Sequence, residues 1–192
     1  MRTLQNIIEE VDSLVPNPFD NNKKIMWLNA INKEFFEFVK IPAVITLFTE
    51  AGRSVYPVPP DLHSRNVDQV QVGGAFYRNA RYEDVNPEHN QWLADEKKKE
   101  IQLIPPPYVH GLRIAIRYAA SWKSTFTTSG LTSSPDAPEE YHDAYVYGLC
   151  ERVAKAMNDV TMANNYGSDY REAILSAQQT YGMTPVTSGG VE

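Results

Sequence analysis

The side chains of this chain that could carry out chemistry are few and widely separated. Glu139 and His142 form a Glu-x-x-His pair, which matches half of a carboxylate di-iron site because residues three apart share one side of a helix. The sequence contains no second such pair. Cys150 is the only cysteine, and its apolar neighbours favour buried packing over a nucleophilic role. The sequence therefore predicts no metal site, no cofactor and no catalytic residue.

Two basic clusters and a set of tyrosines are the remaining candidates for binding. Lys97 to Lys99 could contact phosphate, but acidic residues bracket them, so a solvated charged cluster is favoured. Arg113 and Arg117 share one face of an expected strand, where they either pair with acidic residues of a neighbouring subunit or face solvent. Spacing favours a helix core or a protein interface over base stacking for five tyrosines: Tyr141, Tyr145, Tyr166, Tyr170 and Tyr181.

Four helices are expected to position these side chains, two at each end of the chain. Apolar residues recur every three or four positions over 3–15 and again over about 20–40. The stretch 136–181 predicts two more helices, with Asp136 capping the first and Gly182 capping the second. The first helix of this stretch also carries small residues along its apolar side: Ala144, Gly148 and Ala156. Such a stripe predicts close helix packing.

The region from about 43 to 127 has the pattern of short strands. Strands are predicted over residues 44–49, 53–58, 67–72, 75–78, 101–104 and 112–118. The second is expected to return along the first after a turn at Ala51 and Gly52. Gly73 and Gly74 predict a tight hairpin turn between the third and fourth of them. Short connections favour antiparallel pairing. Residues 86–100 are expected to be a polar connection with at most a helical turn around Trp92.

These elements predict an α+β fold, in which a four-helix bundle made of two N-terminal and two C-terminal helices contains an inserted small antiparallel β domain. The expected boundaries are residues 1–42 and 133–182 for the helical domain and 43–132 for the β-rich insertion. Residues 183–192 have no periodicity and are expected to form a flexible C-terminal tail.

Composition narrows the function classes. The chain has 192 residues, of which 42% are hydrophobic and 22% charged, so it is expected to fold. A net charge of −6 argues against a dedicated nucleic-acid binder, although an acidic wall suits DNA that must pass without sticking. No apolar run is long enough to span a membrane, and the acidic N-terminus does not resemble a signal peptide. The lone cysteine suits a reducing cytoplasm, and a soluble protein that is not exported is expected.

Three stretches carry a family resemblance. They are the helical segment Trp27–Asn32, the turn Tyr56–Leu62 before a strand, and Ala137–Ala144, which leads into a small-residue helix and then a tyrosine-rich one. Together they resemble the head-to-tail connector proteins of tailed bacteriophages, also called adaptor or head-completion proteins. Minimal members of that family are nearly all helical, so the β region is a departure from the family pattern.

The resemblance implies a structural virion protein without enzymatic activity, located at the head–tail junction and assembled in the host cytoplasm. Its four-helix connector bundle would form a ring, expected to be twelve-fold, beneath the portal protein. The ring would extend the DNA channel, let DNA pass non-specifically and provide the attachment site for a tail or stopper protein, without contacting a membrane. Candidate subunit or portal contacts are Tyr141, Tyr145, Tyr166, Tyr170, Tyr181, Arg113 and Arg117.

Three alternatives stay open from the sequence. A tail-completion or tail-tube-end protein would bind the tail tube in place of the portal. A small-molecule-binding or enzymatic β domain would use Tyr56, His63, Arg113 or Arg117 in a deep pocket. A nucleic-acid-binding module would use Lys97 to Lys99 and show strong, salt-dependent binding.

Overall fold

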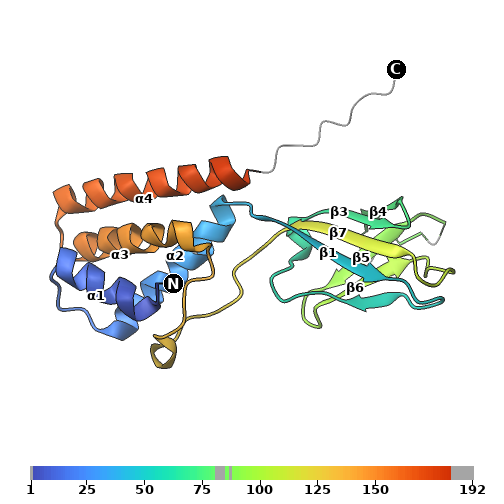
Figure 1. Ribbon diagram of the computed structural model, residues 1–192, viewed down its shortest axis with the longest axis horizontal. Helices are drawn as coiled ribbons and strands as arrows, with labels where there is room; N and C mark the ends of the chain where they lie inside the picture. Colours follow the sequence, from blue (N-terminus) through green and yellow to red (C-terminus); the bar gives the residue numbers. More distant parts are fainter. Residues whose placement is uncertain (1, 81–84, 87, 183–192) are drawn as a thin grey trace, which may run out of the picture. The chain divides into compact units, whose positions relative to one another are not determined.

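The computed structural model describes residues 2–80, 85–86 and 88–182. The expected tail at 183–192 lies outside these residues. The chain divides into two compact units (Figure 1): a helical unit, formed by residues up to Ile41 and from Trp122 onward, and a β unit, Pro42–Ser121. The fold class is α+β, as the sequence predicts.

The helical unit contains four α-helices: α1 (Leu4–Leu14), α2 (Asn21–Phe38), α3 (His142–Ala156) and α4 (Val160–Tyr181). The first two begin where the sequence predicts, because Thr3 and Asp20 accept hydrogen bonds from the backbone N–H groups of Asn6 and Lys23. Gly182 is the C-cap of α4. The two helix pairs expected from the sequence are therefore confirmed.

The start of α3 differs from the prediction. A 3₁₀ turn at Glu139–Tyr141 precedes the helix, which begins at His142. The Asp136 carboxylate does not cap it, because Oδ2 accepts hydrogen bonds from the N–H groups of Lys123 and Ser124 at 2.8 and 2.9 Å. Asp136 thus fixes the loop that enters the helical unit, and the expectation that it caps the helix was wrong.

One apolar core holds the four helices together. Buried positions recur on α1, α2 and α3 with the helical spacing seen in the sequence, and α3 contacts each of the other three helices. The close approach depends on Gly148 of α3. A Cβ atom there would lie 3.2 Å from both the Ile31 side chain and the Tyr170 ring. Ala144 and Gly148 are therefore part of a packing seam, as predicted, whereas Ala156 is exposed and the expectation for it was wrong.

The β unit contains one curled sheet of seven strands in the order β1-β7-β3-β4-β5-β6-β2 (Figure 1). The strands are β1 (Pro42–Phe48), β2 (Val55–Pro57), β3 (Val67–Val72), β4 (Ala75–Asn79), β5 (Gln91–Asp95), β6 (Glu100–Ile104) and β7 (Arg113–Ala119). The β3–β4 hairpin turns at Gly73 and Gly74, which both have positive φ. Ile114, Ile116 and Tyr118 of β7 point into the core, as their alternation predicts.

Three expectations for the β unit were wrong. Residues 91–95, expected to be a polar connection, form the strand β5, because Trp92 and Leu93 are both buried. β5 also pairs in parallel with β4, so the sheet is not wholly antiparallel. β2 does not return along β1. It pairs with β6, while β1 pairs with β7 over its full length.

Candidate functional site: the α3–α4 face of the helical unit

Two of the candidate tyrosines hold α3 and α4 in place from inside the core. Tyr145 is 0% exposed, and its hydroxyl donates to Asn32 Oδ1 of α2 at 2.6 Å. Tyr170 is also buried and donates to Glu34 at 3.3 Å, beside the Arg152–Glu34 ion pair at 2.6 Å. Burial raises the pKa of both hydroxyls, so they stay protonated donors. In a single folded chain these two side chains serve the core and present no surface to a partner.

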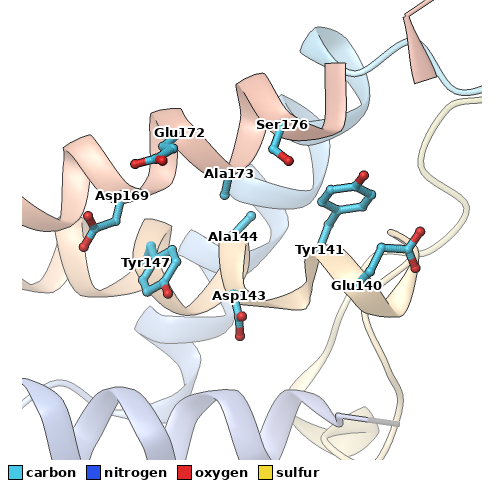
Figure 2. A pocket seen from close by; sticks show the side chains of 9 residues that line it. All are labelled: Glu140, Tyr141, Asp143, Ala144, Tyr147, Asp169, Glu172, Ala173 and Ser176. Atoms are coloured by element: carbon cyan, nitrogen blue, oxygen red, sulfur yellow. The ribbon is translucent and has the colours of Figure 1, made fainter. Parts of the chain in front are cut away.

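A hollow of about 420 Å³ opens between α3 and α4 (Figure 2). Ala144 and Ala173 face each other at its centre, and Tyr147 and Tyr141 stand on either side. The remaining lining residues are polar or acidic: Glu140, Asp143, Asp169, Glu172 and Ser176. The hollow exists because the two facing side chains at its centre are alanines. Its wall is aromatic and acidic, because tyrosines and carboxylates surround it.

The carboxylates of the hollow outnumber the cations near it. Arg2 pairs with Asp143 and, at 3.4 Å, with Glu10. Asp169 and Glu172 make no ion pair or hydrogen bond with another residue in the described part of the chain. Burial, Asp143 and Asp169 together raise the pKa of Tyr147. The hollow therefore carries surplus negative charge and suits a cationic partner.

Tyr141 and Tyr181 close one end of this surface. Their rings meet edge to face with centroids 5.8 Å apart, and the Tyr181 hydroxyl donates to Glu140 Oε1 at 2.8 Å. That hydrogen bond, with burial and the Glu140 charge, raises the pKa of Tyr181 to about 12. Tyr166 is half-buried farther along α4. These three tyrosines thus combine core packing with an accessible edge.

Arg113 and Arg117 lie on β7 in the other unit. Their strand pairing places Arg113 opposite Phe48 and Arg117 opposite Val44, both on β1. Arg113 donates to the Thr46 hydroxyl at 3.3 Å, and it is exposed. The partly basic strand face predicted from the alternation is confirmed.

Charge is divided unequally between the two units. The helical unit contains fifteen acidic and nine basic residues, whereas the β unit contains nine of each. The whole net charge of −6 therefore belongs to the helical unit. A surface that meets α3 and α4 is expected to be basic.

The family model described as SU10 adaptor protein matches residues 2–189, which is nearly the whole chain and includes both units. The chain belongs to the SU10 adaptor family. Its role is that of a structural phage adaptor, which is not a class of enzyme, and such a role implies a virion component that contacts portal and tail proteins. No curated protein matches the chain.

Two side chains of this SU10-family adaptor that first suggested chemistry, Cys150 and His142, are buried. Cys150 is buried, and burial raises the pKa of its thiol to about 12, so it is a poor nucleophile at neutral pH. His142 is buried, with Nε2 2.9 Å from the Ala137 carbonyl. Among residues that the structure describes, no group of three or more His, Cys, Asp or Glu could hold a metal ion. Within the same residues, no helix is both long and apolar enough to cross a membrane.

Sequence reasoning missed the acidic wall of this adaptor and the aromatic residue Tyr147. A signal was available, because Glu140 and Asp143 are three apart, as are Asp169 and Glu172. Asp169 and Glu172 therefore share one face of α4, whereas Glu140 lies in the 3₁₀ turn before α3 and Asp143 in the first turn of α3. What the spacing does not indicate is that both pairs line the same hollow, since that depends on how α3 packs on α4.

Proposed function

We propose that this SU10-family adaptor forms a ring beneath the portal protein at the head–tail junction, twelve-fold in symmetry, and that the ring is built in the host cytoplasm. It continues the DNA channel and provides the attachment site for a tail or stopper protein. The observation that carries the proposal is the family match over residues 2–189. The match includes the β unit as well as the helices, so the β unit is part of the region that defines the family.

The helical unit is assigned the part of the four-helix connector bundle, with boundaries at 1–42 and 133–182. The single core shared by α1 to α4 supports this assignment, because a ring subunit must keep its shape while both of its sides meet neighbours. The insertion 43–132 presents a second surface, and the segment 183–192 is assigned to docking on the portal.

Five of the seven interface candidates keep a place in this proposal. Tyr141, Tyr166 and Tyr181 have accessible edges on the helical unit, and Tyr and Arg are enriched where protein surfaces meet. Arg113 and Arg117 supply contacts from the β unit. Tyr145 and Tyr170 act indirectly, since their buried hydrogen bonds position the helices that carry the others.

The acidic character of the helical unit supports a channel through which DNA passes without binding. Like charges repel, so carboxylates that face the duplex raise the free energy of phosphate contact. The fifteen acidic residues of this unit, against nine basic ones, fit that role.

Single-particle cryo-EM of the native virion, or of this chain with its cognate portal protein, tests the proposal when no symmetry is imposed. We expect density for twelve copies stacked coaxially beneath the portal, with the helical units around the channel. A mature particle that lacks this chain, or a chain bound only at the far end of the tail tube, would overturn it.

A further inference from the structure

The outer face of strands β1, β7, β3 and β4 combines exposed apolar residues with arginines. Cross-strand pairs place Val44, Arg117 and Gln69 in one row, and Phe48 and Arg113 in another. A third row joins Thr46, Ala115, Gln71 and Phe76. Val44, Phe48 and Phe76 are 58%, 63% and 59% exposed. None of the residues in these rows is acidic, and the exposed Asp68, at the β3 bulge next to Gln69, is the acidic residue that borders them.

The strand at the edge of this face, β1, lacks the features that usually protect edge strands from association. β1 is an edge strand of seven residues, and its sequence PAVITLF contains no charged residue. Natural edge strands are commonly blunted by charges, bulges or extreme shortness, because an apolar flat edge promotes association. The opposite edge, β2, has only three residues, whereas β1 has seven and carries a proline only at its first position. The contrast indicates that β1 and the adjoining face are covered in the working assembly.

The chain itself presents a surface that complements this face. The α3–α4 hollow bears the carboxylates of Asp169 and Glu172, which have no cationic partner among the described residues. It also contains the aromatic surface of Tyr141 and Tyr147 and the methyl group of Ala173. A basic apolar sheet face and an acidic aromatic helix face match in both charge and polarity.

We propose that the outer face of the β unit docks on the α3–α4 face of a second copy of this chain, with Arg113 and Arg117 paired to the carboxylates of the hollow. Arg113 and Arg117 are four residues apart on a strand, so their Cα atoms lie about 13 Å apart. Packed helix axes lie about 8–10 Å apart, so one arginine meets the acids at the start of α3 while the other meets those of α4. The proposal rests on the association of copies that the proposed function requires.

The contact is heterologous, because each copy uses its sheet face toward one neighbour and its helix face toward the other. Such a contact closes into a ring when the rotation per subunit divides a full turn. Double-stranded DNA is the other acidic partner that a basic face could meet. The second copy is favoured because the aromatic and alkyl side chains of the face, Val44, Phe48 and Phe76, match the hollow and have no complement on a phosphate backbone.

Charge reversal in trans tests the pairing. R113E/R117E reverses the charge of the sheet face, and D169R/E172R reverses the charge of the two α4 carboxylates of the helix face; both sets change side chains at the protein surface. We expect sedimentation velocity to show wild-type association above the 21.7 kDa monomer, and each variant alone to weaken it about tenfold or more. An equimolar mixture of the two variants restores association, because each reversed pair of side chains then meets a pair of opposite charge.

The matched control is K97E/K98E, which changes the net charge of the β unit equally but lies at the turn between β5 and β6. It is expected to leave association unchanged. A wild-type chain that stays monomeric at several hundred micromolar, a mixture that fails to reassociate, or an equal loss in the control would overturn the pairing. So would salt-dependent binding of a short DNA duplex that R113E/R117E abolishes while self-association persists.

These outcomes are separable from those of the proposed function. Wild-type protein that occupies the head–tail junction but fails the mixing test would leave the adaptor ring standing and overturn this contact. Wild-type protein that passes the mixing test but is absent from virions would support the contact and overturn the ring at the portal.

Discussion

The helical unit and the β unit differ in where their polar side chains make contacts. Side-chain hydrogen bonds join the helices of the first unit, as the buried Tyr145–Asn32 pair and the partly buried Tyr170–Glu34–Arg152 cluster show. The β unit also buries polar side chains, but Thr49 bonds to the backbone of Val109 and Leu112, and the Tyr118–Asp61 hydrogen bond is long at 3.4 Å. The difference teaches that side-chain pairs inside the chain fix the first unit, whereas the second carries Arg113 and Arg117 on its outer face.

Core truncations give the largest expected effect and test whether the two units unfold separately. Phe35→Ala in α2 removes a fully buried ring and should lower the free energy of unfolding of the helical unit by about 3–5 kcal/mol. Ile116→Ala in β7 should cost the β unit about 2–5 kcal/mol. Hydrogen exchange, resolved by peptide, measures each unit in both variants.

Thiol labelling of Cys150 gives an independent readout of the same variants. Its thiol is buried with a pKa raised to about 12, so it should react at pH 8 only when the helical unit opens. Phe35→Ala should accelerate labelling and Ile116→Ala should not. Equal acceleration by both substitutions would mean that the two units unfold as one cooperative body.

Glycine substitutions sharpen the comparison, since the two units use glycine for different reasons. Gly148→Val places methyl groups against Ile31 and Tyr170, and overpacking of this kind costs about 1–3 kcal/mol. Gly74→Ala meets no atom within 4 Å but must adopt a φ of +92°, which costs about 1–2 kcal/mol. Denaturant unfolding measures both. Replacing Ile31 by Val should relieve part of the first cost and none of the second.

Removing one tyrosine hydroxyl from each unit compares how much a buried hydrogen bond contributes to the stability of that unit. Tyr145→Phe leaves Asn32 Oδ1 without its donor and should destabilise the helical unit by about 1–3 kcal/mol. Tyr118→Phe breaks only a 3.4 Å hydrogen bond to Asp61 in the β unit and should cost less. Thermal unfolding of the two variants tests the order. An equal or larger loss for Tyr118→Phe would contradict the contrast drawn between the cores.

The smallest expected effect is a pH dependence within the β unit. Burial of Glu96 opposes ionisation, but hydrogen bonds from Ser64 and the charges of His63 and Lys99 outweigh it and lower the pKa to about 2. Because this pKa is below the unfolded value of about 4.3, the stabilisation is complete above about pH 4.5 and is lost as pH falls toward 2.

Glu96→Gln should therefore lower the free energy of unfolding by less than about 1 kcal/mol at pH 6, since the side chain is 40% exposed and screened by solvent. The difference from wild type should vanish near pH 2. Denaturant titrations at several pH values measure it. A difference that grows as the pH falls would contradict the depressed pKa.

Periodicity and capping in the sequence determined the local structure of this protein. The helical stripes of α1, α2 and α4, the Gly73–Gly74 hairpin and the alternating strand β7 were all predictable, because each depends on neighbours within a few residues. The strand β5 was not, since Trp92 and Leu93 stand among charged residues and only their burial against distant strands makes that segment extended.

Tertiary structure alone decided which of these elements meet. The candidate tyrosines share one spacing in the sequence, yet packing buries Tyr145 and Tyr170, leaves Tyr141 at the rim of a hollow and sets Tyr181 against the Tyr141 ring. The acidic pair Glu140 and Asp143 at the start of α3 is far in the chain from Asp169 and Glu172 on α4, and the two pairs become one surface only because those helices pack together. Spacing determines which residues share a face of one element, but long-range packing determines what that face meets.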